Sequence, residues 1–141
     1  MDNIGIIVDD LDAMVAFFLE LGLELEGKAS VEGDWVDRLV ALRGVRCDIA
    51  MLRTPDGHGR IELSSFQKPK AHPADPHAPV NTLGLRRLMF AVTDIDEVLG
   101  RLRKHGAELM GEMVQYEDHY RLCYLRGPEG IMIALAQPLR E

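Results

Sequence analysis

The stretch LRRLMFAVTDID at residues 85–96 repeats the pattern of MDNIGIIVDDLD at residues 1–12. The match begins at residues 3 and 87 and continues without a gap to residues 27 and 111. Internal repetition of this length indicates two copies of one supersecondary unit rather than a short-period solenoid. The matched pairs include Val8 with Val92, Asp10 with Asp94, Asp12 with Asp96, Gly22 with Gly106, Glu24 with Glu108 and Gly27 with Gly111.

Each copy opens with a predicted strand followed by a predicted helix. The β-branched and apolar residues at 3–8 and 87–92 are typical of strands. Apolar residues at helical spacing then predict helices over 11–21 and 95–105. The cap candidates are Asp10 and Gly22 for the first helix and Asp94 and Gly106 for the second.

Further strands are predicted after each helix, and the two copies also end alike. TPDGHGRIEL in the first copy matches GPEGIMIAL in the second, a turn followed by a strand. The first copy is longer by one residue, so that Glu62 aligns with Ala134. The predicted strands lie near 25–32, 36–43, 46–53 and 60–66 in the first copy, and near 108–116, 119–126 and 130–137 in the second.

The composition is typical of a globular protein, with 141 residues, 47% hydrophobic and 28% charged. We expect a single domain over 1–141, made of unit one at 1–66, a proline-rich linker at 67–83 and unit two at 84–141. No apolar run approaches a membrane span and no signal-peptide pattern is present, so a cytoplasmic protein without a membrane partner is expected. The net charge of −7 argues against nucleic acid, whose phosphates require a basic surface.

Two βαβββ units, each closed by a Pro-Asp-Gly or Pro-Glu-Gly turn and a last strand, resemble the vicinal oxygen chelate superfamily of glyoxalases, extradiol dioxygenases and bleomycin resistance proteins. NIGIIVDDLDAMVAFFLELGLEL and PEGIMIAL carry the resemblance, which covers essentially the whole chain. It implies an α+β fold in which the two tandem units form a cup-shaped mixed sheet, with helices on the outside and the ligand inside. It also implies a homodimer.

The resemblance implies a metal site built from a His on the first strand and a Glu on the last strand of each unit. Here those positions hold Asn3, Glu62, Arg87 and Ala134. Arginine cannot coordinate a metal, because it stays protonated and has no free lone pair. One remaining carboxylate does not hold a transition metal against water. We therefore expect no metal and no other cofactor.

The charges at these positions suggest a replacement for the ion. We hypothesise that the Arg87 guanidinium takes roughly the place of the metal and pairs with Glu62, leaving a pair that can hydrogen-bond a polar ligand group. The alternative is that both residues are partners at a dimer interface.

Strand alternation indicates which other side chains face the ligand. If Arg87 faces inward, Met89 does so as well, and the repeat places residues 3, 5 and 7 on the equivalent face. Trp35 and Tyr120 are as compatible with an aromatic ligand wall as with a structural role, whereas Tyr124 is more typical of a half-buried strand residue. The predicted ligand-binding residues are Asn3, Gly5, Ile7, Trp35, Glu62, Arg87, Met89, Tyr120 and Ala134.

Other reactive residues lack a supporting motif. Cys47 and Cys123 lie in apolar runs, which favours small buried hydrophobic residues over a disulfide or a metal site. His72 and His77 are expected to be solvated linker residues. His119 follows Asp118 in a predicted turn, where a catalytic dyad is the less favoured interpretation.

Two functions follow from these residues. The favoured one is a metal-independent protein that binds and sequesters a small apolar or aromatic natural product, as in drug resistance. The alternative is a glyoxalase-like lyase, isomerase or epimerase, with Glu62 as general base and Arg87 stabilising the oxyanion. A neighbouring guanidinium would lower the pKa of Glu62 and weaken it as a base, which favours binding.

Overall fold

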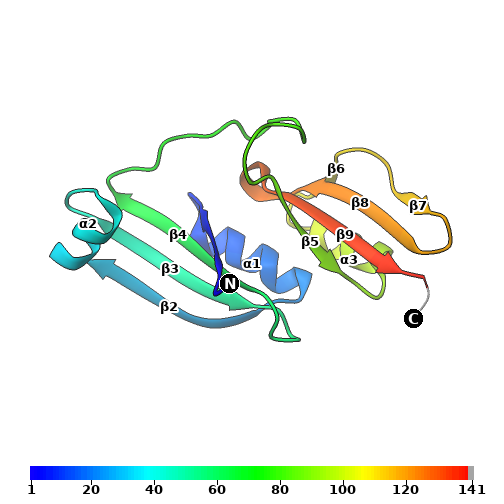
Figure 1. Ribbon diagram of the computed structural model, residues 1–141, viewed down its shortest axis with the longest axis horizontal. Helices are drawn as coiled ribbons and strands as arrows, with labels where there is room; N and C mark the ends of the chain where they lie inside the picture. The colour runs from blue at the N-terminus through cyan, green and yellow to red at the C-terminus, as the bar shows by residue number, and fades with distance from the viewer. Residues whose placement is uncertain (140–141) are drawn as a thin grey trace. The chain divides into compact units, whose positions relative to one another are not determined.

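The computed structural model describes residues 1–139, which form two compact units, Met1–Ala74 and a second that begins at Asp75 (Figure 1). The division between them falls inside the proline-rich linker. Each unit builds a mixed sheet of its own, so the α+β class and the tandem βαβββ arrangement are confirmed. The two units are described in turn.

Unit 1 contains a four-stranded sheet in the order β1-β4-β3-β2. β1 runs parallel to β4, and the other neighbours are antiparallel. Helix α1 packs on β3 and β4 and covers one face of this sheet (Figure 1). The elements are β1 (Ile4–Ile7), α1 (Leu11–Leu21), β2 (Glu24–Glu32), α2 (Asp34–Val40), β3 (Arg46–Arg53) and β4 (Arg60–Lys68).

Unit 2 repeats this plan with the order β5-β9-β8-β6, and the short strand β7 also pairs with β8. β5 runs parallel to β9, and α3 packs on β9. The elements are β5 (Arg87–Ala91), α3 (Ile95–Arg103), β6 (Glu108–Leu109), β7 (Val114–Tyr116), β8 (Tyr120–Arg126), the 3-10 turn η1 (Pro128–Gly130) and β9 (Met132–Pro138).

Strand register confirms the internal repeat. Gly5 on β1 lies opposite Glu62 on β4, and Met89 on β5 lies opposite Ala134 on β9. The sequence alignments match Gly5 with Met89 and Glu62 with Ala134, so equivalent residues of the two units form equivalent pairs. The duplication therefore extends from the sequence pattern to the hydrogen-bonded register of both sheets.

The two matching helices form for the same local reasons. The Asp10 carboxylate accepts a hydrogen bond from the Ala13 N–H at 3.0 Å, and the Asp94 carboxylate accepts one from the Glu97 N–H at 3.1 Å. Gly22 ends α1 at φ 121°, a conformation open to glycine. Among the described residues, no helix is long and apolar enough to cross a membrane. The buried helix residues that form the core are Met14, Val15, Phe17, Phe18 and Leu21 in α1, and Ile95, Val98, Leu99 and Leu102 in α3.

Three predicted elements were wrong in type or extent. Residues 36–43 are not a strand, because α2 spans Asp34–Val40 there and buries Val36. A short apolar run fits a helix turn as well as a strand, and here tertiary packing decides. The predicted strand 108–116 is two short strands, β6 and β7, interrupted around Gly111, and the second helix ends at Arg103 rather than at residue 105.

The linker is anchored to unit 2 by one arginine. The Arg126 guanidinium donates hydrogen bonds to the carbonyl oxygens of Pro76 at 3.2 Å, Gly130 at 3.3 Å and Ala78. Gly130 has φ +81°, and a Cβ atom added to it would overlap the backbone of Pro76. The linker therefore passes so close to the η1 turn that only glycine fits there.

We predict that Gly130→Ala lowers the free energy of unfolding by about 2 kcal/mol or more, because the new methyl group meets backbone and the left-handed conformation disfavours alanine. Gly111→Ala is the matched control, since nothing lies within 4 Å of its added Cβ and its φ is not positive. Urea denaturation of both variants measures the difference. Equal stability of the two would show that the linker does not lie against the turn.

Candidate functional site

The candidate site in unit 2 lies on the sheet face opposite α3. Met89 is the register partner of Ala134, and Ala134 is also the partner of Tyr124 on β8. Alternation then places Arg87 on the same face as Met89. This face brings together two residues from the predicted set of metal positions, Arg87 and Ala134.

Tyr124 holds the Arg87 side chain. The Arg87 Nε–H donates a hydrogen bond to the Tyr124 hydroxyl oxygen at 2.5 Å. The guanidinium carbon lies 5.3 Å from the centroid of the Tyr124 ring, within the range of a cation–π interaction. The Tyr124 side chain therefore fixes the orientation of the guanidinium, and with it the directions of the remaining N–H groups.

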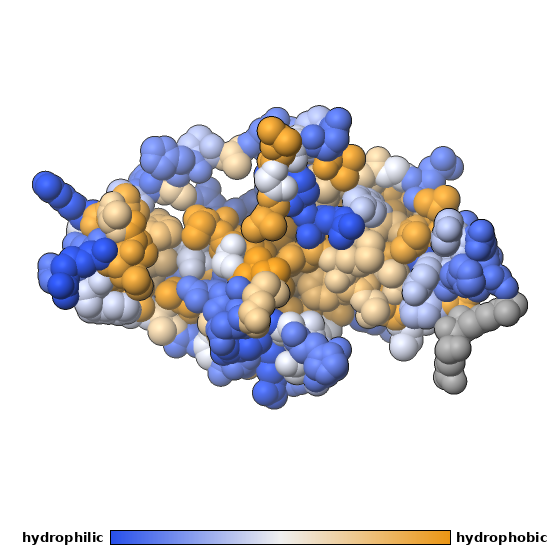
Figure 2. All heavy atoms as spheres, viewed as in Figure 1, coloured by the Kyte–Doolittle hydropathy of each residue, from blue (hydrophilic) through white to orange (hydrophobic). Residues whose placement is uncertain are grey.

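The floor around this cation is apolar. Met132, Ala134 and Ala136 on β9 are all buried, and Ala134 is fully covered. Met89 remains 44% exposed beside them and offers a soft, adaptable surface. Figure 2 shows pale orange, apolar atoms gathered over β5 and β9. Because the β9 residues are covered, a flat apolar molecule can contact this face at Met89, with a polar group directed to Arg87.

Unit 1 presents the matching face with different chemistry. Glu62 is half-buried and accepts a hydrogen bond from the Ser64 hydroxyl at 3.4 Å. Gly5, its register partner, has open space where a Cβ would be, and Ile7 is 56% exposed on the same face. These residues form an open surface with one carboxylate.

Asn3 belongs to a charged network at the end of this face. Its side-chain amide donates to the Asp2 carboxylate at 2.7 Å, and Asp2 also accepts from Arg60 at 3.0 Å. Arg60 pairs further with Glu26 at 3.0 Å, and this hydrogen bond lowers the pKa of the Glu26 carboxyl below its ordinary value. The side-chain amide of Asn3 is thus engaged in a hydrogen bond with the neighbouring Asp2 carboxylate.

The donor set at the four family positions does not fit a metal. Asn3 is held by Asp2, Arg87 carries a positive charge, and Ala134 has no donor atom. Within residues 1–139, no three His, Cys, Asp or Glu side chains gather into a group that could hold a metal ion. No chemical step through a metal is derived from these residues.

The proposed Arg87–Glu62 pair stays a prediction. Its two members belong to different units, and the hydrogen bond of Arg87 goes to Tyr124. Sequence reasoning missed Tyr124 as a site residue and preferred Tyr120, which lies at the start of β8 and is 44% exposed. The missed signal is strand alternation, since Tyr124 is four residues beyond Tyr120 and shares its face.

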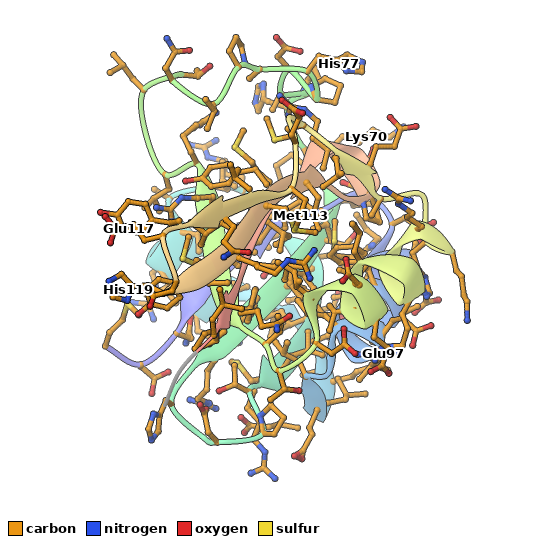
Figure 3. The ribbon with its side chains drawn as sticks, turned by 90° about the vertical axis from the view of Figure 1, so that its right-hand side faces the viewer. Lys70, His77, Glu97, Met113, Glu117 and His119 are labelled. Atoms are coloured by element: carbon orange, nitrogen blue, oxygen red, sulfur yellow. The ribbon has the colours of Figure 1, made fainter. Side chains whose placement is uncertain are left out.

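The remaining aromatic candidate, Trp35, lies on α2 and is 55% exposed. Its role as a ligand wall stays a prediction. His119 lies in the turn between β7 and β8, 3.3 Å from the Glu117 carboxylate and 3.7 Å from that of Asp118. Figure 3 shows the labelled Glu117 and His119 pointing outward from this turn. The turn is an exposed ion-pair cluster.

The two cysteines are buried and free, which confirms their interpretation as small hydrophobic residues. Burial raises the pKa of both thiols above the ordinary value. A raised pKa lowers the thiolate fraction, and the thiolate is the reactive form. Neither Cys47 nor Cys123 is therefore suited to act as a nucleophile.

Two βαβββ units with parallel first and last strands define a protein of the vicinal oxygen chelate class. The chain belongs to the glyoxalase/bleomycin resistance protein/dioxygenase superfamily, whose family model matches residues 2–124.

Similar proteins support this membership. A glyoxalase family protein from Bacillus cereus is 56% identical, with a TM-score of 0.95 over 99% of this chain and 94% of that one. The uncharacterized protein YaeR of Escherichia coli (strain K12) is 29% identical over 134 residues, 94% of this chain and 92% of its own. A mutant of the fosfomycin resistance protein FosX from Listeria monocytogenes, complexed with Mn(II), has a TM-score of 0.63 over 100% of this chain and 90% of its own; at 13% identity this likeness shows the fold alone.

We predict that the untagged protein, equilibrated with Ni²⁺, Zn²⁺ or Mn²⁺ and then dialysed, retains far less than an equimolar amount of metal, because three of the four family positions lack a suitable donor. Elemental analysis measures the retained metal. A combined Asn3→His, Arg87→His and Ala134→Glu variant is the comparison, and it is expected to gain metal. Stoichiometric metal in the unaltered protein would contradict the prediction.

Proposed function

We propose that this protein binds a small apolar or aromatic molecule without the help of a metal, and holds it rather than converting it. The observation that carries the proposal is the Arg87–Tyr124 contact on an apolar floor. This contact stands where the resemblance implies metal ligands. A fixed cation on an apolar surface is a binding arrangement for a ligand with an apolar body and a polar end.

The chemistry of the ligand follows from the two halves of this arrangement. Arg87 has five N–H donors, one of which is used by Tyr124, so that a carboxylate, phenolate or carbonyl oxygen can be bound by the others. Met89 and the buried alanine floor favour an aromatic or aliphatic body. The family name supports the proposal, because it includes resistance proteins of the bleomycin type.

The alternative, an isomerase-type or lyase-type enzyme, is supported by a specific feature of unit 1. Glu62 is a half-buried carboxylate with a hydroxyl donor, Ser64, beside it at 3.4 Å. Such a group can remove a proton from a carbon next to a carbonyl. In this reading Arg87 stabilises the oxyanion that develops. The two functions differ in whether the ligand is recovered unchanged.

We predict that a thermal-shift screen of aromatic natural products finds ligands that raise the melting temperature of the metal-free protein. At a free ligand concentration of about 100 times Kd, binding adds about 2.7 kcal/mol of stability. That corresponds to roughly 8 °C for a chain of this size. Chromatography of the bound fraction is expected to return the ligand unchanged.

Two variants test the roles of the residues. Arg87→Met keeps a long side chain and removes the charge, and it is expected to weaken ligands with an acceptor group by about tenfold or more. Glu62→Gln is expected to leave binding unchanged. Conversion of the ligand by the unaltered protein, lost in Glu62→Gln, would favour the enzyme and overturn sequestration.

A further inference from the structure

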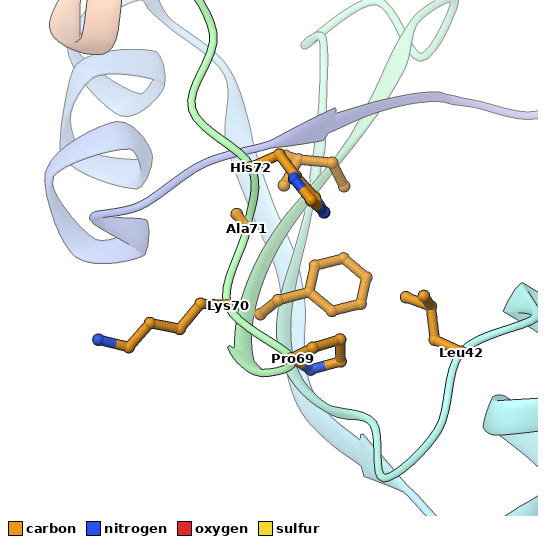
Figure 4. A pocket seen from close by; sticks show the side chains of 7 residues that line it. Leu42, Pro69, Lys70, Ala71 and His72 are labelled. Atoms are coloured by element: carbon orange, nitrogen blue, oxygen red, sulfur yellow. The ribbon is translucent and has the colours of Figure 1, made fainter.

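Unit 1 contains a pocket of about 270 Å³ that lies at the end of its sheet. The wall is made by Ile7 of β1, Phe66 of β4, Leu42 from the loop after α2, and residues 69–72 of the linker. Figure 4 shows Leu42, Pro69 and His72 turned toward the enclosed space, whereas the Lys70 side chain points away from it. Ile7 is the single member of the predicted ligand-binding set in this wall.

The loop that carries Leu42 is fixed by hydrogen bonds to α2. The Asp37 carboxylate accepts from the N–H groups of Gly44 at 2.9 Å and Val45 at 2.8 Å. The Leu42 N–H donates to the carbonyl oxygen of Asp37 at 3.2 Å. The wall is therefore held in place before a ligand arrives, which reduces the cost of binding.

A small core supports the opposite side of the pocket. Val36, Val45 and Cys47 are buried together, and Phe66 packs against them. This packing holds Phe66 at the pocket while Leu42 and Ile7 remain 42% and 56% exposed. Exposed aliphatic groups around an aromatic ring form a surface on which another ring can stack.

The size of the pocket fits a two-ring molecule. A protein cavity of about 150 Å³ binds benzene, and this pocket, at about 270 Å³, is nearly twice as large. It lies below the usual range for drug-sized ligands, about 300–1,000 Å³. A compact aromatic molecule is therefore the best match in volume.

The charge around the pocket is opposite to that of the whole chain. Lys68 and Lys70 flank Pro69, and Arg46 is the register partner of Lys68 on one side and of Glu32 on the other. Throughout residues 1–139, none of these three cations takes part in an ion pair. His72 adds an imidazole to the wall. In a protein with a net charge of −7, this local excess of positive charge favours an anionic ligand group.

We propose that this pocket is a second binding site, for a small aromatic carboxylate. The rings lie against Phe66, Ile7 and Leu42. The carboxylate lies at the mouth, near Lys68, and accepts a hydrogen bond from the His72 imidazole. The site goes beyond the proposed function, because it needs neither Arg87 nor any other residue of unit 2.

Three probes of equal ring size and different charge test the ligand class by calorimetry: 1-naphthoate, 1-naphthol and 1-naphthylmethylammonium. In the Arg87→Met variant, which lacks the ligand-binding cation proposed for unit 2, we expect 1-naphthoate to bind to one site, about tenfold more tightly than 1-naphthol, and the ammonium probe to bind most weakly. The variant Lys68→Gln is expected to reduce the affinity for 1-naphthoate to that for 1-naphthol. Equal affinity for all three probes would overturn the assignment of an anionic ligand.

A matched pair of variants tests the location. Ala71 lines the pocket, whereas Ala74, in the same linker and equally exposed, does not. Ala71→Phe is expected to weaken 1-naphthoate at least tenfold by filling the space, and Ala74→Phe to leave it unchanged. Leu42→Gln gives a second test by making the wall polar, and circular dichroism verifies that the variants fold.

Arg87→Met separates this site from the proposed function, because it removes the cation of unit 2 and is expected to leave 1-naphthoate binding at the pocket of unit 1 unchanged. Binding that is lost in Arg87→Met and retained in Ala71→Phe would overturn the pocket and support the Arg87 site. Absence of 1-naphthoate binding in the unaltered protein would also overturn the pocket. Neither outcome affects sequestration of a larger ligand at Arg87.

Discussion

Parallel pairing of the first and last strand in each unit is the constraint on which the candidate site depends. Parallel neighbours cannot be joined by a tight turn and need a long connection, here a helix and two or three further strands. The pairing places Gly5 beside Glu62 and Met89 beside Ala134. Residues that are far apart in sequence therefore share one sheet face. In each unit the helix packs on the other face of the sheet.

The repeat and its main elements could be predicted because their signals are local. An aspartate cap, helical spacing of apolar residues and a closing glycine lie within a few turns of chain, and both copies show them. α2 could not be predicted in this way. Its seven residues bury one side chain, Val36, against a core whose other members come from β3 and the loop before it. Whether such a short segment forms a helix or a strand is decided by its packing against other parts of the sheet.

Part of the candidate site could be predicted because its signal, too, is local. Strand alternation correctly placed Arg87 and Met89 on one face, because alternation is a property of the strand itself. The partner of Arg87 depends on the register between β8 and β9, which brings Tyr124 opposite Ala134. Charge reasoning alone favours a carboxylate partner for a guanidinium, and the pairing with Glu62 that it suggests stays a prediction. A phenol and its ring satisfy the same cation without neutralising it.

The choice between a carboxylate and a tyrosine as the partner of Arg87 bears on what the site can do. A carboxylate held against Arg87 would cancel its charge and compete with an anionic ligand for its N–H groups. Tyr124 instead accepts one hydrogen bond and leaves the positive charge in place over an apolar floor. At the positions where the resemblance implies metal ligands, the second unit has a guanidinium held by Tyr124, while the first has the carboxylate of Glu62 with a serine beside it. Starting from the same duplicated framework, the equivalent sheet faces of the two units offer opposite charges, a carboxylate in unit 1 and a guanidinium in unit 2.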